Sequence, residues 1–402
     1  MSDLTCSSGS DALATKMSPA ADPNIFKLLD RSTPSIRLIQ ILLEDDRAIS
    51  CKFHNFNLAD CPPYQALSYA WGPSEPTANI ELDGSPFTVR ENLYQALRAL
   101  RRSLEEVIST GHLGPLSKPF TSSYFWVDAI CIDQANVLER NHQVNLMSRI
   151  YSQASTVAVW LGPETEDSAL AMKHLSNKVR FHQNIRDAIS ALCHRPYWNR
   201  LWIIQELVLA KSIYVLCGSG YQDWENLVRL ASNMEDEDED HINSSRTNFL
   251  LPDSPARNVI TFRSRWNTLE AKKKTLDSFI VTGGIDKAEC TDPRDRVFGL
   301  LGLVDELGAK SLGITEADYE KSKEEIYCDV LRFLKHNPDG LSMSSFWIAK
   351  PLAVMLRLTT KEDPRSNGFK LLHAFFHPRA GEVADEEEEL RLILEAFEEE
   401  ES

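Results

Sequence analysis

The fold is decided by one stretch of sequence, FWVDAICIDQANVLERNHQVNLMSRIYSQASTVAVWLG, which runs from Phe125 to Gly162. Its opening, Phe125–Ile132, is nearly all apolar, which predicts a strand buried on both faces of a sheet. A helix is predicted for residues 137–154, with a buried stripe made of Val144, Met147, Tyr151 and Ala154. A second buried strand, Thr156–Leu161, follows and stops at Gly162-Pro163. Two buried strands joined by a helix predict a parallel β-α-β unit.

The same alternation continues on both sides of this unit. Apolar strands are predicted at Ile36–Leu43, Tyr64–Trp71 and Ile213–Cys217, and the Asp83-Gly84 pair predicts a hairpin. Asn92 is expected to cap the helix that follows the hairpin. The pattern predicts an α/β fold with a largely parallel sheet flanked by helices, and an added, mainly helical C-terminal part.

In parallel sheets of this kind, ligands bind at the carboxyl ends of the strands. We therefore expect the loops after Trp71, Ile132, Leu161 and Cys217 to line any site. Later in the chain, the helices Tyr197–Ala210 and 319–334 are predicted from their apolar spacing.

Composition divides the chain into five predicted regions. They are a disordered N-terminus (1–24), a main domain (25–232, with core motifs in 64–218), an acidic linker (233–255), a helical extension (256–340) and a variable acidic tail (341–402).

The net charge of −16 argues against nucleic-acid binding, because no basic stripe is present. No 18-residue apolar stretch predicts a membrane span, and no signal-peptide pattern is present, so a cytoplasmic location is expected. The eight cysteines include no CxxC pair, which removes the usual zinc spacing. His373 and His377 lie one helical turn apart, but a third ligand is missing, so no metal site is expected.

Four segments in order resemble the heterokaryon incompatibility (HET) domain of filamentous fungi. They are YQALSYAWG (Tyr64–Gly72), the stretch Phe125–Gly162, YWNRLWIIQELVLA (Tyr197–Ala210) and DPRDRVFGLLGL (Asp292–Leu303). The resemblance covers roughly residues 34–335. It implies a role in non-self recognition and programmed cell death, with the chain itself, as a homo-oligomer, or another incompatibility protein as the partner.

A weaker resemblance, to TIR domains, concerns mechanism and implies a TIR/flavodoxin-like fold. The segment Trp202–Leu207 matches the Trp-x-x-x-Glu-Leu spacing of that family, and Glu139-Arg140 lies where an ERG-like segment would. Enzymatic TIR domains cleave NAD at the nicotinamide–ribose bond. The resemblance therefore implies Glu206 as the candidate catalytic residue and NAD as a candidate substrate, with no cofactor required. A carboxylate near the ribose would stabilise the oxocarbenium-like transition state.

Five further residues are candidates for substrate binding, either as aromatic platforms or as polar contacts at strand ends. They are Trp71, Gly72, Asp128, Asp133 and Trp202.

Each candidate also has a structural interpretation. Glu206 could pair with Arg200, Arg149 or an arginine of the DPRDR segment, because a buried charge is costly unless it is paired. Trp71 and Trp202 could be core or interface residues, and Asp128 could be a hydrogen-bond hub.

The trio Arg294, Asp295 and Arg296 has two interpretations as well. It could form an ion-pair network that joins the main domain to the helical part, or its arginines could bind phosphate.

Three functions remain open from the sequence: a NAD-consuming enzyme, a non-catalytic module that self-associates, and a degenerate domain without activity. The first predicts that Glu206 faces a cleft. The second predicts an exposed apolar patch, and a Glu206 that is shielded from solvent and paired to an arginine. The third predicts neither.

Overall fold

A computed structural model describes residues 25–43, 48–110, 122–177, 181–231, 254–269, 274–277, 280, 288–304, 312–337, 345–360, 366–377 and 385–401. The predicted disordered N-terminus (1–24) and the acidic run Glu235–Asp240 lie outside these residues.

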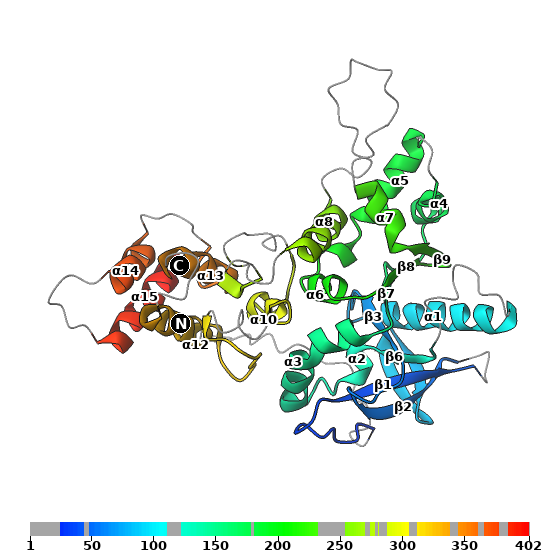
Figure 1. Cartoon of the computed structure of the whole chain (residues 1–402), viewed down its shortest axis with the longest axis horizontal. Coiled ribbons are helices and arrows are strands. Elements are labelled where there is room, and N and C mark those ends of the chain that lie inside the picture. Colours follow the sequence, from blue (N-terminus) through cyan, green and yellow to red (C-terminus); the bar gives the residue numbers. More distant parts are fainter. Residues whose placement is uncertain are drawn as a thin grey trace, which may run out of the picture.

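A nine-stranded sheet forms the centre of the main domain, in the order β5-β4-β2-β1-β6-β3-β7-β8-β9 (Figure 1). In chain order its strands are β1 (Ser35–Leu42), β2 (Ser50–Asn57), β3 (Gln65–Tyr69), β4 (Thr77–Leu82), β5 (Ser85–Arg90), β6 (Tyr124–Trp126), β7 (Thr156–Trp160), β8 (Ile213–Cys217) and β9 (Gly220–Asp223). The α/β class is confirmed.

The sheet is mixed, so the prediction of a largely parallel sheet was wrong. The centre, β6-β3-β7-β8, pairs in parallel throughout, and β2 also pairs in parallel with β4. Strand β1 runs antiparallel to β6 and β2, β4 and β5 form an antiparallel hairpin, and β9 folds back on β8. The additional strands come from hairpins, which need short turns and no crossover helix.

The Asp83-Gly84 hairpin has the predicted turn. Both residues have positive φ, 49° and 79°, as a two-residue turn matched to the strand twist requires.

Helices follow the strands in the main domain. They are α1 (Glu91–Thr110), α2 (Asp128–Cys131), α3 (Val137–Gln153), α4 (Glu166–His174), α5 (Gln183–Cys193), the 3₁₀ helix η1 (Pro196–Asn199), α6 (Trp202–Val208), α7 (Trp224–Ala231) and α8 (Pro255–Thr268).

A second group of helices lies away from the sheet, and in Figure 1 one member, α10, stands between α6 and the others. Its members are α10 (Asp295–Leu301), α12 (Lys323–His336), α13 (Ser345–Met355), α14 (Asn367–Phe376) and α15 (Glu386–Glu401). Helix α15 buries Leu390, Ile393 and Phe397 against these neighbours, so the acidic end of the chain contains a packed helix. Within the described part of the chain, no helix combines the length and apolar character that a membrane crossing would need.

The predicted strand Phe125–Ile132 is wrong beyond its start. Strand β6 ends at Trp126, and Val127 is the last extended residue (φ −134°, ψ 111°). Helix α2 begins at Asp128, whose carboxylate accepts the Ala129 N–H at 2.7 Å. Asp128 therefore opens a short helix and does not lie inside a strand. A carboxylate that satisfies a free N–H favours a helix start over a continued strand.

Asn92 does not cap α1, which begins one residue earlier at Glu91. Its side chain donates to the Ala70 carbonyl at 2.6 Å and accepts from Trp160 Nε1 at 2.9 Å. Asn92 thus joins the carboxyl ends of β3 and β7.

The predicted helix Tyr197–Ala210 is broken into η1 and α6. Arg200 is extended between them (φ −69°, ψ 135°) and forms a parallel bridge with Glu289 from the later part of the chain. The predicted helix 319–334 begins later, at Lys323, where Ser322 and Glu325 form a capping box.

A buried ion pair fixes the start of α3 against β1. Arg37 is fully buried, and its Nη1 lies 2.9 Å from Glu139 Oε1 and 2.7 Å from the Cys131 carbonyl. The rings of Phe26 and Phe53 cover the guanidinium at 5.0 and 5.3 Å. Glu139, predicted in an ERG-like position, thus contacts an arginine of β1.

Two glycines allow the cost of backbone strain alone to be compared with the cost of strain plus steric overlap. Gly84 has φ +79° and nothing within 4 Å of an added Cβ, whereas Gly218 has φ +57° and would place a Cβ 2.3 Å from Glu164 Cβ. We expect Gly84→Ala to reduce the free energy of unfolding by about 1 kcal/mol. Gly218→Ala should cost about 1–3 kcal/mol more, because overlap adds to strain.

Urea unfolding of the two variants and of the wild type measures these costs. Equal costs for the two glycines would contradict the packing at the end of β8.

Candidate functional site

The Glu206 carboxylate lies inside the protein, with 2% of the residue exposed. Ser68 Oγ of β3 donates a hydrogen bond to Glu206 Oε2, and the Tyr197 hydroxyl lies 2.7 Å from Ser68 Oγ. Arg200 Nη1 lies 4.0 Å from Glu206 Oε1. Glu206 is thus held by the Ser68 hydroxyl, which also contacts the Tyr197 hydroxyl, and it faces a guanidinium.

Local structure explains why these groups converge. Ser68 is one of the five buried residues of β3, and its hydroxyl contacts that of Tyr197, which comes from η1. The break after η1 turns Arg200 back toward the end of β3, where it donates to the Tyr69 carbonyl. Helix α6 then begins and brings Glu206 under the same strand end.

Arg200 lies between two carboxylates. Burial raises the pKa of Asp128, and the nearby Arg200 opposes that rise. Asp128 also accepts from Trp71 Nε1 at 2.7 Å, and Gln134 donates to the Asp128 carbonyl at 2.9 Å. These contacts make Asp128 a hydrogen-bond hub at the end of β3.

Burial raises the pKa of Glu206 to about 7, while Arg200 and the Ser68 hydrogen bond favour the charged form and limit the rise. A carboxyl group with such a pKa can hold or release a proton near neutral pH. Its burial keeps that proton from solvent in this conformation.

The Trp71 ring is half-buried, and one of its faces is covered. The Arg90 guanidinium carbon lies 5.2 Å from the ring centroid, and Arg90 Nη1 donates to the Gly72 carbonyl at 2.7 Å. Gly72 has φ +71°, a conformation that favours glycine and turns the chain away from β3. Trp71 is therefore stacked on an arginine side chain.

Trp202 and Asp133 contact other groups. Trp202 Nε1 donates to Asp295 Oδ2 at 3.2 Å, so its indole faces the helical part. The Asp133 carboxylate accepts from the Ala135 N–H at 3.1 Å, and its own N–H donates to Glu139. The structure thus joins Glu206, Asp128 and Trp71 through Arg200, and directs Trp202 and Asp133 elsewhere.

The Arg294–Arg296 segment lies at the junction with the helical part. Arg294 pairs with Asp292 at 2.6 Å and donates to the carbonyls of Tyr319 and Lys321 at 3.1 and 2.6 Å. Burial raises the pKa of Asp295 to about 6, opposed by hydrogen bonds from Tyr319 and Trp202.

Sequence reasoning missed Ser68 and Tyr197, which complete the cluster around Glu206. The signal was small: each is a hydroxyl residue inside a motif that also contains large apolar residues, YQALSYAWG and YWNRLW respectively. A buried hydroxyl must find a partner, which makes such a residue a candidate for a polar cluster.

The sequence model of the heterokaryon incompatibility protein family matches residues 64–206. Residues 64–206 of the chain match the HET domain. Its matched segment begins at Tyr64 and ends at Glu206, so both ends of the HET domain motif meet in the Ser68–Glu206 hydrogen bond.

Two curated relatives extend this result. "Heterokaryon incompatibility protein 6, OR allele" of Neurospora crassa is 27% identical over 322 residues, covering 65% of this chain and 46% of the relative. "Vegetative incompatibility protein HET-E-1" of Podospora anserina is 27% identical over 152 residues, covering 38% of this chain and 9% of the relative. The chain thus spans less than half the length of these two relatives. No solved structure matches it.

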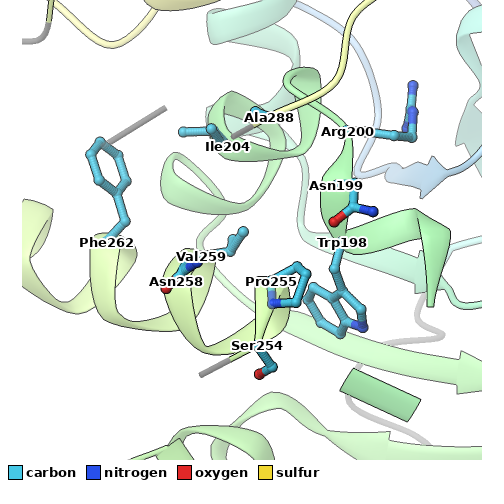
Figure 2. Close-up of a pocket in the computed structure, with 10 residues that line it drawn as sticks. All are labelled: Trp198, Asn199, Arg200, Ile204, Ser254, Pro255, Asn258, Val259, Phe262 and Ala288. Atoms are coloured by element: carbon cyan, nitrogen blue, oxygen red, sulfur yellow. The ribbon is translucent and has the colours of Figure 1, made fainter. Parts of the chain in front are cut away.

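A pocket of about 250 Å³ borders the HET domain motif on the side of α8 (Figure 2). Trp198, Asn199, Pro255 and Phe262 are among its lining residues, and Glu206 is not. Arg200, which faces Glu206, is also among the lining residues labelled in Figure 2, so the pocket and the Glu206 cluster share this arginine.

No group of three or more His, Cys, Asp or Glu side chains among the described residues is arranged to hold a metal ion. The His373 and His377 rings lie 4.6 Å apart, centroid to centroid.

The raised pKa of Glu206 predicts a pH-dependent stability. A carboxyl whose folded pKa lies above its unfolded value stabilises the fold at low pH, and this contribution is lost as pH rises from about 4.5 to about 7. Relative to wild type, Glu206→Gln should therefore gain about 3 kcal/mol of stability between pH 5 and pH 8.

Urea unfolding at both pH values checks this, with the exposed Glu166→Gln as the matched control. A Glu206→Gln variant whose stability difference from wild type is the same at both pH values would show that Glu206 titrates normally.

Proposed function

We propose that this chain acts in heterokaryon incompatibility, the fungal rejection of genetically different partners, as a cytoplasmic signalling module of programmed cell death. The observation that carries the proposal is the HET family match to residues 64–206, together with relatives named for incompatibility. The matched segment is a packed unit and not an isolated motif, because its two ends are hydrogen-bonded inside the core.

Burial of the Glu206 cluster supports a non-catalytic module. A catalytic carboxylate must reach its substrate, and Glu206 is 2% exposed and already bonded to Ser68. Trp71 is stacked on Arg90, and Trp202 is bonded to Asp295. In this reading the module signals through association with itself or with another incompatibility protein.

A second candidate function is TIR-like hydrolysis of NAD, with NAD as the substrate. It is favoured by a carboxyl of pKa about 7 beside the Ser68 and Tyr197 hydroxyls, at the carboxyl end of a parallel strand. Glu206 would stabilise the positive charge that grows on the ribose. This chemistry requires α6 to move first, because Glu206 is closed off from solvent.

Inducible expression of the full chain in a filamentous fungus tests the signalling role. We expect a severalfold rise in hyphal compartments stained by a vital dye, in expressing hyphae or after their fusion with a different strain. Val159→Asp is the control, because a charge at the centre of β7, where the native residue is fully buried, should abolish folding.

Wild-type protein present at normal level that causes neither growth arrest nor death, alone or after fusion, would refute the proposed role.

Release of nicotinamide from NAD by the purified full chain tests the second candidate. If hydrolysis operates, Glu206→Gln should lower the rate by about 100-fold or more, since it removes the charge but keeps the side-chain shape. Glu166→Gln should behave as wild type, and circular dichroism should show that all three proteins fold. Equal rates for wild type and folded Glu206→Gln would exclude Glu206 as the catalytic residue.

A further inference from the structure

Helix α6 is shared by two hydrophobic cores. Ile203 and Leu207 belong to the core beneath the sheet, whereas Leu201, Ile204 and Val208 belong to the core of the helical part. Glu206 lies on the side of the sheet, where Ser68 holds it. The position of α6, and with it the burial of Glu206, therefore depends on contacts from both directions.

A helix of this length cannot hold its own shape. Helix α6 has seven residues, which is about two turns, and isolated helices shorter than about 12 residues are marginal in water. Its conformation is consequently imposed by its neighbours.

The first contact from the helical part is made by backbone. Glu289 donates to the Asn199 carbonyl at 2.5 Å, and its own carbonyl accepts from the Leu201 N–H at 3.0 Å. This bridge lies at the break between η1 and α6, and it fixes the point at which α6 begins.

The second contact is made by side chains. Asp295 accepts from Trp202 Nε1 of α6 at 3.2 Å and from the Tyr319 hydroxyl at 2.5 Å. The Tyr319 ring packs edge-on against Phe298, with centroids 5.0 Å apart. The half-buried carboxylate of Asp295 thus connects α6 to two parts of the later chain.

The third contact is with α3. Asn145 donates to the Ala317 carbonyl at 3.2 Å and accepts from the Ala317 N–H at 2.7 Å. The Arg140 guanidinium carbon lies 4.9 Å from the Tyr319 ring centroid. Residues near 317–319 are thereby held against the HET domain.

Two glycines of α10 and its end allow close approach. A Cβ at Gly302 would lie 1.7 Å from Gln205 Nε2, so only glycine fits against α6 at that point. A Cβ at Gly299 would lie 3.6 Å from Leu201, an ordinary van der Waals contact. The segment that contains these two glycines therefore lies directly on α6.

We propose that residues 288–304 and 312–319 form an autoinhibitory strap that holds α6 in the position that buries Glu206 and covers its second apolar face. The HET domain signals when the strap leaves α6. This inference rests on the proposed function. It differs from a simple packing role in one respect: loosening the strap should increase signalling, whereas loosening a structural contact should decrease it.

Two substitutions change the strap in opposite directions. Asp295→Asn weakens the hydrogen bonds from Trp202 and Tyr319 by removing the charge. Gly299→Ala tightens the strap, because the added methyl group contacts Leu201 and alanine favours the helix. Glu316→Gln, at an exposed position of the strap, is the matched control.

Hydrogen–deuterium exchange of the full chain gives the first readout. We expect α6 amides to exchange about tenfold faster in Asp295→Asn. They should exchange about two- to fivefold more slowly in Gly299→Ala. Exchange in β1 and throughout Glu316→Gln should stay at the wild-type rate. Unchanged α6 exchange in both strap variants would overturn the proposal.

Cell death in the fungal expression assay gives the second readout. We expect more death with Asp295→Asn and less with Gly299→Ala than with wild type, at equal protein levels. Reduced or unchanged death with Asp295→Asn, when α6 alone is loosened, would show that the strap is only structural.

Two results separate the possible failures. If β1 also exchanges faster in Asp295→Asn, that variant is globally destabilised and Gly299→Ala decides: slower α6 exchange with less death supports the strap, and any other result overturns it. If wild type kills no cells under any condition, the proposed function fails, and the autoinhibitory role fails with it. The exchange data then still report whether the strap holds α6.

Discussion

The position of α6 is the constraint on which the rest of this structure depends. The helix presents apolar side chains to two separate cores, and between them it carries Glu206, a carboxylate that water cannot reach. Removing such a group from water is unfavourable unless partners replace the lost hydration. Ser68 and Arg200 supply these partners, and both depend on the chain breaking between η1 and α6.

Arg200 connects several levels of the structure. Its backbone forms the bridge with Glu289, and its guanidinium reaches the end of β3 and faces two carboxylates, Glu206 and Asp128. One residue therefore links the later helical part to the polar cluster of the HET domain. A change in how Glu289 is held would alter the charge environment of Glu206 without any direct contact between the two.

Local patterns predicted the elements that local physics determines. The Asp83-Gly84 hairpin and the buried strand β7 follow from turn chemistry and apolar runs, and both are observed. The prediction of a strand across Asp128 was wrong, because Asp128 starts α2 and its carboxylate accepts a hydrogen bond from Trp71, a residue distant in the sequence. The continuous helix predicted for Tyr197–Ala210 was also wrong, since the break at Arg200 is caused by pairing with Glu289, far along the chain. The antiparallel pairings of the sheet were missed because pairing order is set by packing and not by the sequence of each strand.

Because α6 is shared between two cores, the segment matched by the family does not include all the residues that it needs to bury its apolar side chains. The motif stops at Glu206, but two of its apolar side chains, Leu201 and Ile204, belong to the core that is formed mainly by later helices. A HET motif transplanted into another chain would carry this uncovered stripe with it. Each architecture that hosts the motif must therefore contribute a surface of its own to complete it, and the shape of that surface offers a route by which otherwise similar motifs could be placed under different control.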